Sequence, residues 1–183
     1  ELLNTTFGYP DFRPGQEEVI GAIQSGENVL AVMPTGSGKS LCYQIPALLS
    51  DGLTLVVSPL VALMEDQVAA LKINGVLTEA LNSSRNRDAN VDIWKRVAAG
   101  EVKILYIAPE RLMTDRMLAA LQKLPISQIT IDEAHCISRW GPSFRPDYED
   151  LTRLSELFPG IPISAFTATA DAATRQDISE KLF

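Results

Sequence analysis

The sequence is poor in the residues that define several classes of protein. Its two cysteines, Cys42 and Cys136, and its single histidine, His135, are too few for a four-ligand zinc site. We therefore predict reduced, unpaired thiols and no zinc. No apolar run approaches the roughly 18 residues of a membrane span, and the opening ELLNTTFGYPDF lacks the basic-then-apolar order of a secretory signal. These absences predict a soluble, intracellular protein with no membrane partner.

Basic side chains are also scarce. Lys and Arg together number 16 against 23 Asp and Glu, which gives a formal net charge of −7 and a pI near 4.7. Because phosphate backbones favour a basic face, this charge argues against a free-standing nucleic-acid binder. Any contact with nucleic acid must be local, or shared with other parts of a longer protein. We expect such a longer protein because the chain opens at Glu1 and not at a methionine.

Short apolar runs alternate with helical patterns along the whole chain. The runs predict strands over residues 28–33, 53–58, 78–81, 102–107, 127–132 and 162–167. No repeat, low-complexity tract or linker divides the chain, so we predict one α/β domain over residues 1–183. Its fold class is a parallel sheet with helices on both faces, in three layers. Ligands in such sheets bind at the carboxyl ends of the strands.

Helical spacing of apolar residues specifies two buried faces. A helix over 60–73 is expected to bury Leu60, Leu63, Met64, Val68 and Leu71. A helix from Asp147 is expected to bury Leu151, Leu154 and Phe158. A third helix is predicted to begin at the capping residue Asp171.

The clearest chemistry follows the first strand, in MPTGSGKSLCYQIPALL. Gly36 and Gly38 permit a tight turn whose N–H groups point at phosphate oxygens, and the next helix presents its positive end. Lys39 is expected to reach the β and γ phosphates, and the Ser40 hydroxyl to ligate Mg²⁺. Met33 replaces the first glycine of G-x-x-x-x-G-K-[ST], which leaves a glycine-rich turn with an incidental lysine as the alternative. The residues predicted to bind the nucleotide here are Thr35, Gly36, Ser37, Gly38, Lys39, Ser40 and Leu41.

A second motif, ITIDEAH, ends an apolar strand in two carboxylates. Asp132 is predicted to hold Mg²⁺ and Glu133 to orient or deprotonate the attacking water, because adjacent side chains at a strand end point in different directions. Alone, the tetrapeptide DEAH would also fit a chance surface sequence. Its place at a strand end after the phosphate loop favours the catalytic interpretation. His135 is interpreted as a link between nucleotide and partner, with a satisfied core histidine as the alternative.

Together with AFTATA, these motifs resemble motifs I, II and III of superfamily 2 helicases. The runs FGYPDFRPGQ, SPLVALMEDQV, YIAPERL and DEAHCISRWGPSFRPDY further resemble, in order, the N-terminal RecA-like lobe of RecQ-family DNA helicases, over nearly the whole chain. The resemblance implies a RecA-like P-loop fold, ATP and Mg²⁺ as cofactors, and single-stranded or duplex-junction DNA as partner. It implies a 3′-to-5′ DNA helicase of repair and recombination, in the bacterial cytoplasm or nucleoid or in a eukaryotic nucleus. No [NT]-K-x-D sequence occurs, which agrees with ATP over GTP.

The resemblance also implies an adenine site in FGYPDFRPGQ. Tyr9 would stack on the base, Gln16 would hydrogen-bond to it, and Arg13 would complete the site. The alternative is structural: a helix that starts near Pro14 and buries its apolar face. Both interpretations are compatible.

The run CISRWGPSFRPDY resembles the aromatic-rich loop with which RecQ proteins sense single-stranded DNA. Trp140, Phe144 and Tyr148 would stack on unpaired bases, and Arg145 would contact phosphate or make a cation–π interaction. Aromatic side chains packed inward under an ordinary loop are the alternative. The family usually has His-Asp where Pro142 and Ser143 stand, which predicts DNA binding with weakened coupling to hydrolysis.

The resemblance implies roles for two further motifs. Ser58 and the start of the following helix would meet the DNA backbone. Thr167 and Thr169 would connect the ATP and DNA sides, or else cap the next helix.

The resemblance places a second RecA-like lobe, and zinc-binding and winged-helix regions, outside this chain. Since the arginines of the second lobe complete the ATP site, we expect the isolated chain to bind Mg·ATP weakly, to hydrolyse it poorly and not to unwind DNA. One alternative is a non-catalytic ATP- and DNA-binding regulatory module. Another is a P-loop small-molecule kinase, although the sequence has no acceptor-binding lid with clustered arginines.

Overall fold

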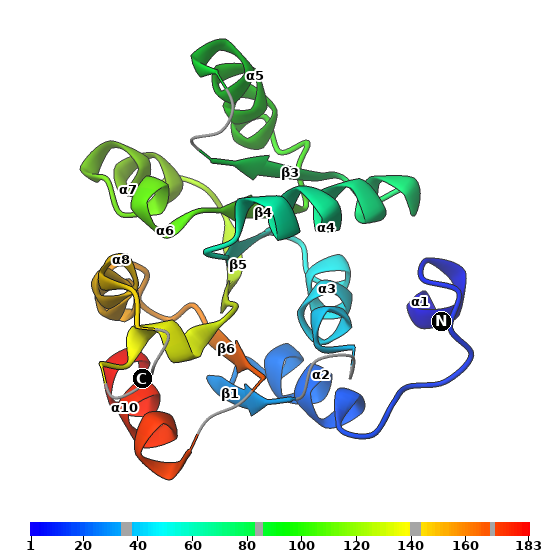
Figure 1. The fold of residues 1–183 in the computed structure, drawn as a ribbon. Helices are drawn as coiled ribbons and strands as arrows, with labels where there is room; N and C mark the ends of the chain where they lie inside the picture. Colours follow the sequence, from blue (N-terminus) through cyan, green and yellow to red (C-terminus); the bar gives the residue numbers. More distant parts are fainter. Residues whose placement is uncertain (34–37, 83–85, 140–143, 169–170) are drawn as a thin grey trace.

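The computed structural model describes residues 1–33, 38–82, 86–139, 144–168 and 171–183. Six strands form one sheet in the order β1-β6-β5-β2-β4-β3 (Figure 1). All pairings are parallel. The strands are β1 (Val29–Val32), β2 (Leu53–Val57), β3 (Thr78–Leu81), β4 (Ile104–Ile107), β5 (Ile126–Ile131) and β6 (Ile163–Thr167). The prediction of a parallel α/β sheet is confirmed.

Helices connect successive strands and cover both faces of the sheet. The longer ones are α2 (Gln16–Gln24), α3 (Lys39–Leu49), α4 (Val61–Ile73), α5 (Arg87–Ala98), α7 (Asp115–Leu121) and α10 (Ala172–Leu182). The short ones are α1 (Leu2–Thr5), α6 (Pro109–Leu112), α8 (Pro146–Glu149), α9 (Leu154–Leu157) and the 3₁₀ turns η1 (Ala134–Ile137) and η2 (Asp150–Arg153). In Figure 1, α2 and α3 lie to the right of the sheet, and α7, α8 and α10 lie to its left.

The alternation of side chains along each strand divides the core into two clusters. On β2, Leu55 and Val57 pack with α5, α7 and α10, whereas Val56 packs with α2, α3 and α4. Every residue of β2 is buried, since this strand lies inside the sheet with helices on both faces. This double burial explains why the strands are continuous apolar runs in the sequence.

The predicted buried face of α4 is partly wrong. Met64, Val68 and Leu71 are buried, but Leu60 is 47% exposed and Leu63 is 36% exposed. Leu60 precedes the helix in extended conformation. Leu63 lies about 100° around the axis from Met64, outside the buried stripe.

The helix predicted from Asp147 is not continuous. Residues 146–157 form α8, η2 and α9 in succession. The predicted apolar contacts are nevertheless present, because Leu151, Leu154 and Phe158 are all buried. The helix capped by Asp171 is found as predicted, with the Asp171 side chain accepting the backbone N–H of Thr174.

Both cysteines are buried and free, as predicted. Burial raises the pKa of Cys42 and of Cys136 to about 11, so both remain thiols at neutral pH. In the ranges that the structure describes, no helix has the length and apolar character to cross a membrane.

Candidate functional site

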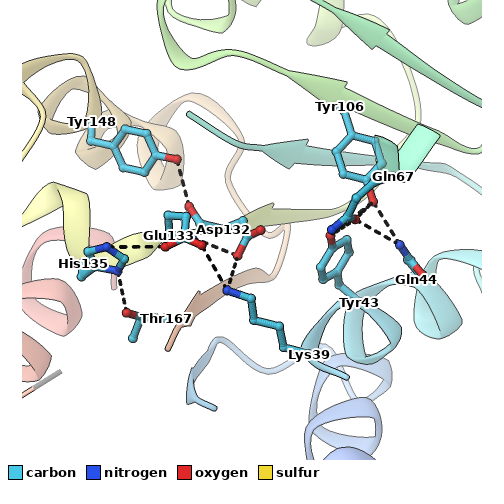
Figure 2. A network of polar contacts seen from close by, with 10 residues as sticks. All are labelled: Lys39, Tyr43, Gln44, Gln67, Tyr106, Asp132, Glu133, His135, Tyr148 and Thr167. Carbon is cyan, nitrogen blue, oxygen red and sulfur yellow. Dashed lines mark hydrogen bonds and ion pairs between the residues drawn. The ribbon is translucent and has the colours of Figure 1, made fainter. Parts of the chain in front are cut away.

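The predicted site lies where the first turn of α3 meets the carboxyl end of β5. Lys39 is the first residue of α3, and Asp132 and Glu133 directly follow β5. The Lys39 Nζ lies 3.3 Å from Asp132 Oδ1 and 3.2 Å from Glu133 Oε1 (Figure 2). Lys39 and the adjacent pair Asp132 and Glu133 lie far apart in the sequence and thus converge, as predicted for ligands at the end of a parallel sheet.

The electrostatics of this cluster depend on burial. Burial raises the pKa of Asp132, although the nearby Lys39 ammonium opposes the effect. Burial alone would lower the pKa of Lys39, but Asp132 and Glu133 outweigh it and raise that pKa. Lys39 therefore remains charged, and its ammonium compensates the buried Asp132 carboxylate.

The backbone between the two carboxylates has an unusual conformation. Glu133 has φ 52° and ψ 43°, and it is the only non-glycine residue with positive φ in the described part of the chain. The Glu133 N–H donates to Asp132 Oδ1 over 3.0 Å. The Tyr148 hydroxyl donates to the Asp132 carbonyl oxygen over 2.9 Å. A left-handed conformation at a non-glycine residue such as Glu133 costs about 1–3 kcal/mol and persists where surrounding contacts fix it.

His135 lies between Glu133 and β6. Its Nε2 is 3.5 Å from Glu133 Oε2, and its Nδ1 is 2.7 Å from the hydroxyl oxygen of the buried Thr167 (Figure 2). Both ring nitrogens therefore face polar partners, one at the Glu133 carboxylate and one at the end of β6. These contacts are compatible with the predicted linking role and with a satisfied core histidine.

Gly38, which precedes α3, is fixed by Gln16. Gly38 has φ 76°, and a Cβ atom there would lie 2.3 Å from Gln16 Nε2. Gln16 is buried; its Nε2 donates to the Gly38 carbonyl over 3.0 Å and its Oε1 accepts the Arg13 N–H over 2.7 Å. In this structure the Gln16 amide joins the segment before α2 to the end of the phosphate loop.

A cavity of about 520 Å³ lies beside this contact, within the size range of small-molecule sites. It brings together six of the predicted residues: Tyr9, Arg13, Gln16, Gly38, Ser40 and Leu41. Further lining residues come from α1 and α4, for example Leu3 and Gln67, which the sequence did not indicate. The predicted adenine and phosphate residues thus line one space.

The residues predicted to contact DNA are only partly accessible. Phe144 and Arg145 are half-buried, and the Arg139 guanidinium lies over the Phe144 ring at 5.6 Å. Tyr148 is fully buried, so the prediction that its ring stacks on a base is wrong for this structure. Burial raises the pKa of Tyr148 well above its usual range, which keeps the hydroxyl protonated as a donor.

Ser58, at the carboxyl end of β2, is also buried, with 3% of its surface exposed. Its hydroxyl has no hydrogen-bond partner among the described residues. A direct contact of this side chain with a DNA backbone therefore does not fit the structure as it stands. Several predicted residues lie outside the described ranges: Thr35, Gly36, Ser37, Trp140, Pro142, Ser143 and Thr169.

A second polar network in Figure 2 joins α3, α4 and β4. The hydroxyls of Tyr43 and Tyr106 donate to Gln67 Oε1 over 2.9 and 2.7 Å, and Gln44 Nε2 donates to the Tyr106 hydroxyl over 3.1 Å. Burial raises the pKa of Tyr106 to about 12, so this hydroxyl is neutral. Such a network fixes how α3 packs on α4. Nothing in the sequence indicated it, because its members are far apart.

Comparison with known proteins agrees with this geometry. A model of the DEAD/DEAH box helicase family matches residues 13–178. The chain is 51% identical over 181 residues to the ATP-dependent DNA helicase RecQ of Haemophilus influenzae, covering 99% of this chain and 29% of that protein. It is 46% identical over 183 residues to the probable ATP-dependent DNA helicase RecS of Bacillus subtilis, covering 100% of this chain and 36% of that protein. The chain therefore spans about a third or less of the length of these curated relatives.

Solved structures share the fold at lower identity. A hypothetical ATP-dependent RNA helicase from Sulfolobus tokodaii has a TM-score of 0.74 and 21% identity, over 96% of this chain and 52% of that one. The DUF1998 helicase MrfA bound to DNA has a TM-score of 0.74 and 21% identity, over 98% of this chain and 27% of that one. The resemblance to RecQ helicases is confirmed by the sequence relatives, and the fold by these structures. Since the family model spans both the phosphate loop and the acidic strand end, this chain belongs to the DEAD/DEAH box helicase family.

Proposed function

We propose that this chain is the first RecA-like, ATP-binding lobe of an ATP-dependent DNA helicase. The observation that supports this function most directly is the convergence of Lys39, Asp132 and Glu133 at the ends of neighbouring elements, within 3.2–3.3 Å. A lysine on the first turn of a helix beside two strand-end carboxylates suits phosphoryl transfer.

The donor set fits a magnesium nucleotide. Mg²⁺ accepts one or two protein carboxylates and keeps several waters, and here Asp132 and Ser40 would hold it. When bound, Mg²⁺ neutralises charge that develops on the phosphates. The Lys39 ammonium would bind the β and γ phosphates, and adenine would enter the cavity lined by Tyr9 and Gln16.

Proton transfer would fall to the second carboxylate. Glu133 would orient the attacking water and accept its proton, and His135 would orient the Glu133 carboxylate through its Nε2. Its Nδ1 contact to Thr167 would hold the imidazole ring in place.

On the DNA side, Phe144 and Arg145 would supply part of a single-strand surface. Because the chain carries a net charge of −7, this lobe would form only part of the single-strand surface, and the second lobe would form the rest. Binding by this lobe alone is therefore expected to be weak and salt-sensitive. Ser58 would take part only after a rearrangement that exposes it.

The names of the relatives support an ATP-dependent DNA helicase. From the resemblance of the motifs, the wider role would be 3′-to-5′ unwinding in DNA repair and recombination, inside the cell. Residues 1–183 would form a single domain, and the second lobe would lie elsewhere in a longer protein. An arginine supplied across such a cleft is worth roughly 10³ to 10⁵ in rate. The chain alone should therefore hydrolyse ATP poorly and unwind no DNA.

The test is Glu133→Gln in the longer protein, which keeps the side-chain shape and removes the base. ATP should still bind, while DNA-stimulated turnover should fall to background. Unchanged turnover would contradict the role of Glu133. An output that survives the loss of hydrolysis would favour a regulatory module, and phosphorylation of an acceptor without DNA would favour a kinase.

A further inference from the structure

The peptide group that joins Asp132 to Glu133 is held at both ends (Figure 2). Its carbonyl oxygen accepts the Tyr148 hydroxyl over 2.9 Å. Its N–H donates to Asp132 Oδ1 over 3.0 Å. A peptide group held on both sides cannot rotate without breaking one of these hydrogen bonds.

The orientation of this peptide group decides where the Glu133 carboxylate lies. Rotation of the group changes φ of Glu133, which has the uncommon value of 52°. With this φ, Glu133 Oε1 lies 3.2 Å from Lys39 Nζ and Oε2 lies 3.5 Å from His135 Nε2. A relaxed backbone at this position would direct the carboxylate elsewhere.

Of the two hydrogen bonds, only the one from Tyr148 comes from outside the DEAH segment. Tyr148 is fully buried, within the same apolar cluster as Ala134 and Ile137 of η1. Its backbone N–H donates to the Arg145 carbonyl over 3.0 Å, and the Arg145 N–H donates to the Cys136 carbonyl over 2.9 Å. The Tyr148 hydroxyl is therefore fixed relative to η1 by backbone bonds as well as by packing.

We propose that Tyr148 is a positioning residue for ATP hydrolysis, whose hydroxyl fixes the 132–133 peptide and thereby aims the Glu133 carboxylate. This inference rests on the proposed function, in which Glu133 is the base. Tyr148 lies on α8, which begins directly after Arg145. A DNA strand bound at Phe144 and Arg145 would therefore act on the segment that aims Glu133. This route would not require the His-Asp pair, in whose place this sequence has Pro142 and Ser143.

The experiment compares Tyr148→Phe with Tyr106→Phe in the longer protein. Both changes remove one hydroxyl from a fully buried tyrosine that donates a hydrogen bond. Only the first touches the 132–133 peptide, so the second controls for the loss of a buried hydroxyl. For each protein, kcat and KM for ATP are measured with saturating single-stranded DNA, together with Tm.

We expect Tyr148→Phe to lower kcat by between about tenfold and a hundredfold, the effect of a catalytic group displaced by about an ångström. KM should stay within about twofold of the wild-type value, because Lys39 and Gly38 keep their places. Tyr106→Phe should leave kcat unchanged, with a fall in Tm at least as large, because the Tyr106 hydroxyl also accepts a hydrogen bond from Gln44.

Three results would overturn the role of Tyr148 while leaving the proposed function intact: an unchanged kcat, equal falls of kcat in both variants, or a rise of KM in parallel with the fall of kcat. A Tyr148→Phe protein whose Tm and ATP affinity both fall would likewise overturn it, since Tyr148 would then only stabilise the fold. A wild-type longer protein that hydrolyses no ATP would overturn the proposed function itself, and this role with it.

Discussion

Replacing Gly38 by alanine should damage both the fold and nucleotide binding, by an amount that the structure allows to be estimated. At φ 76° an L-residue costs about 1–2 kcal/mol. The new Cβ would lie 2.3 Å from Gln16 Nε2, which forces the buried Gln16 side chain to move. Two hydrogen bonds of this side chain, to the Gly38 carbonyl and from the Arg13 N–H, are worth about 1 kcal/mol each.

The sum is about 3–4 kcal/mol, which for a chain of this size corresponds to a fall in Tm of about 10 °C. ATP affinity should fall as well, because the N–H groups at the start of α3 and the cavity wall at Gln16 both shift. Thermal unfolding followed by circular dichroism measures the first effect, and titration calorimetry with Mg·ATP the second.

Gly26→Ala is the matched control. Gly26 has φ 80°, but an added Cβ would meet nothing within 4 Å among the described residues. This variant should lose only the stability that a positive φ costs an L-residue, about 1–2 kcal/mol, and should bind ATP normally. Equal losses of stability in the two variants, or normal ATP binding by Gly38→Ala, would refute the reasoning.

Three further predictions concern α4, α10 and the ion pair. Met64→Ala should lower the free energy of unfolding by about 2–5 kcal/mol, because the side chain is buried, whereas Leu63→Ala should cost less than about 1 kcal/mol; similar costs in urea titrations would contradict the orientation of α4. Asp171→Ala should lower Tm at pH 7. A hydrogen bond from the Thr174 N–H lowers the pKa of Asp171 in the folded protein below its value in the unfolded chain. The stabilisation by Asp171 is therefore complete above the pKa of the unfolded chain and is lost as the pH falls through the pKa of the folded protein. The difference in Tm from wild type should therefore shrink below about pH 4, and a difference that persists there would contradict the cap. Lys39→Met should abolish Mg·ATP binding in calorimetry and also reduce stability, since Asp132 stays buried without its cation; retained binding would contradict the phosphate role of Lys39.

The sequence predicted the sheet well for a physical reason. A parallel sheet covered on both faces requires strands that are apolar along their whole length, and these runs stand out between polar segments. The phosphate loop and the acidic strand end were predictable because their chemistry depends on a few residue types at fixed spacing. The convergence of Lys39 with Asp132 then follows from topology, since Lys39 begins the helix that follows β1, Asp132 follows β5, and both strands end at the same edge of one parallel sheet.

Other features left no signal in the sequence. Apolar spacing alone could not separate Leu63, which is exposed, from Met64, which is buried one position later. Tyr148 follows two other aromatic side chains that suit base stacking, yet its partner is a backbone carbonyl, which no residue type marks. Gln16 satisfies the backbone at Arg13 and Gly38, a contact visible only once the chain has folded.

The most direct test of the account is steady-state ATP hydrolysis by this chain and by the longer protein, each with and without single-stranded DNA. We predict that the chain alone turns over slowly in both conditions, and that the longer protein is stimulated by DNA. That result would also show that Pro142 and Ser143 do not abolish coupling. A longer protein that binds ATP but hydrolyses it at the same rate with and without DNA would contradict the motor function and favour a regulatory module.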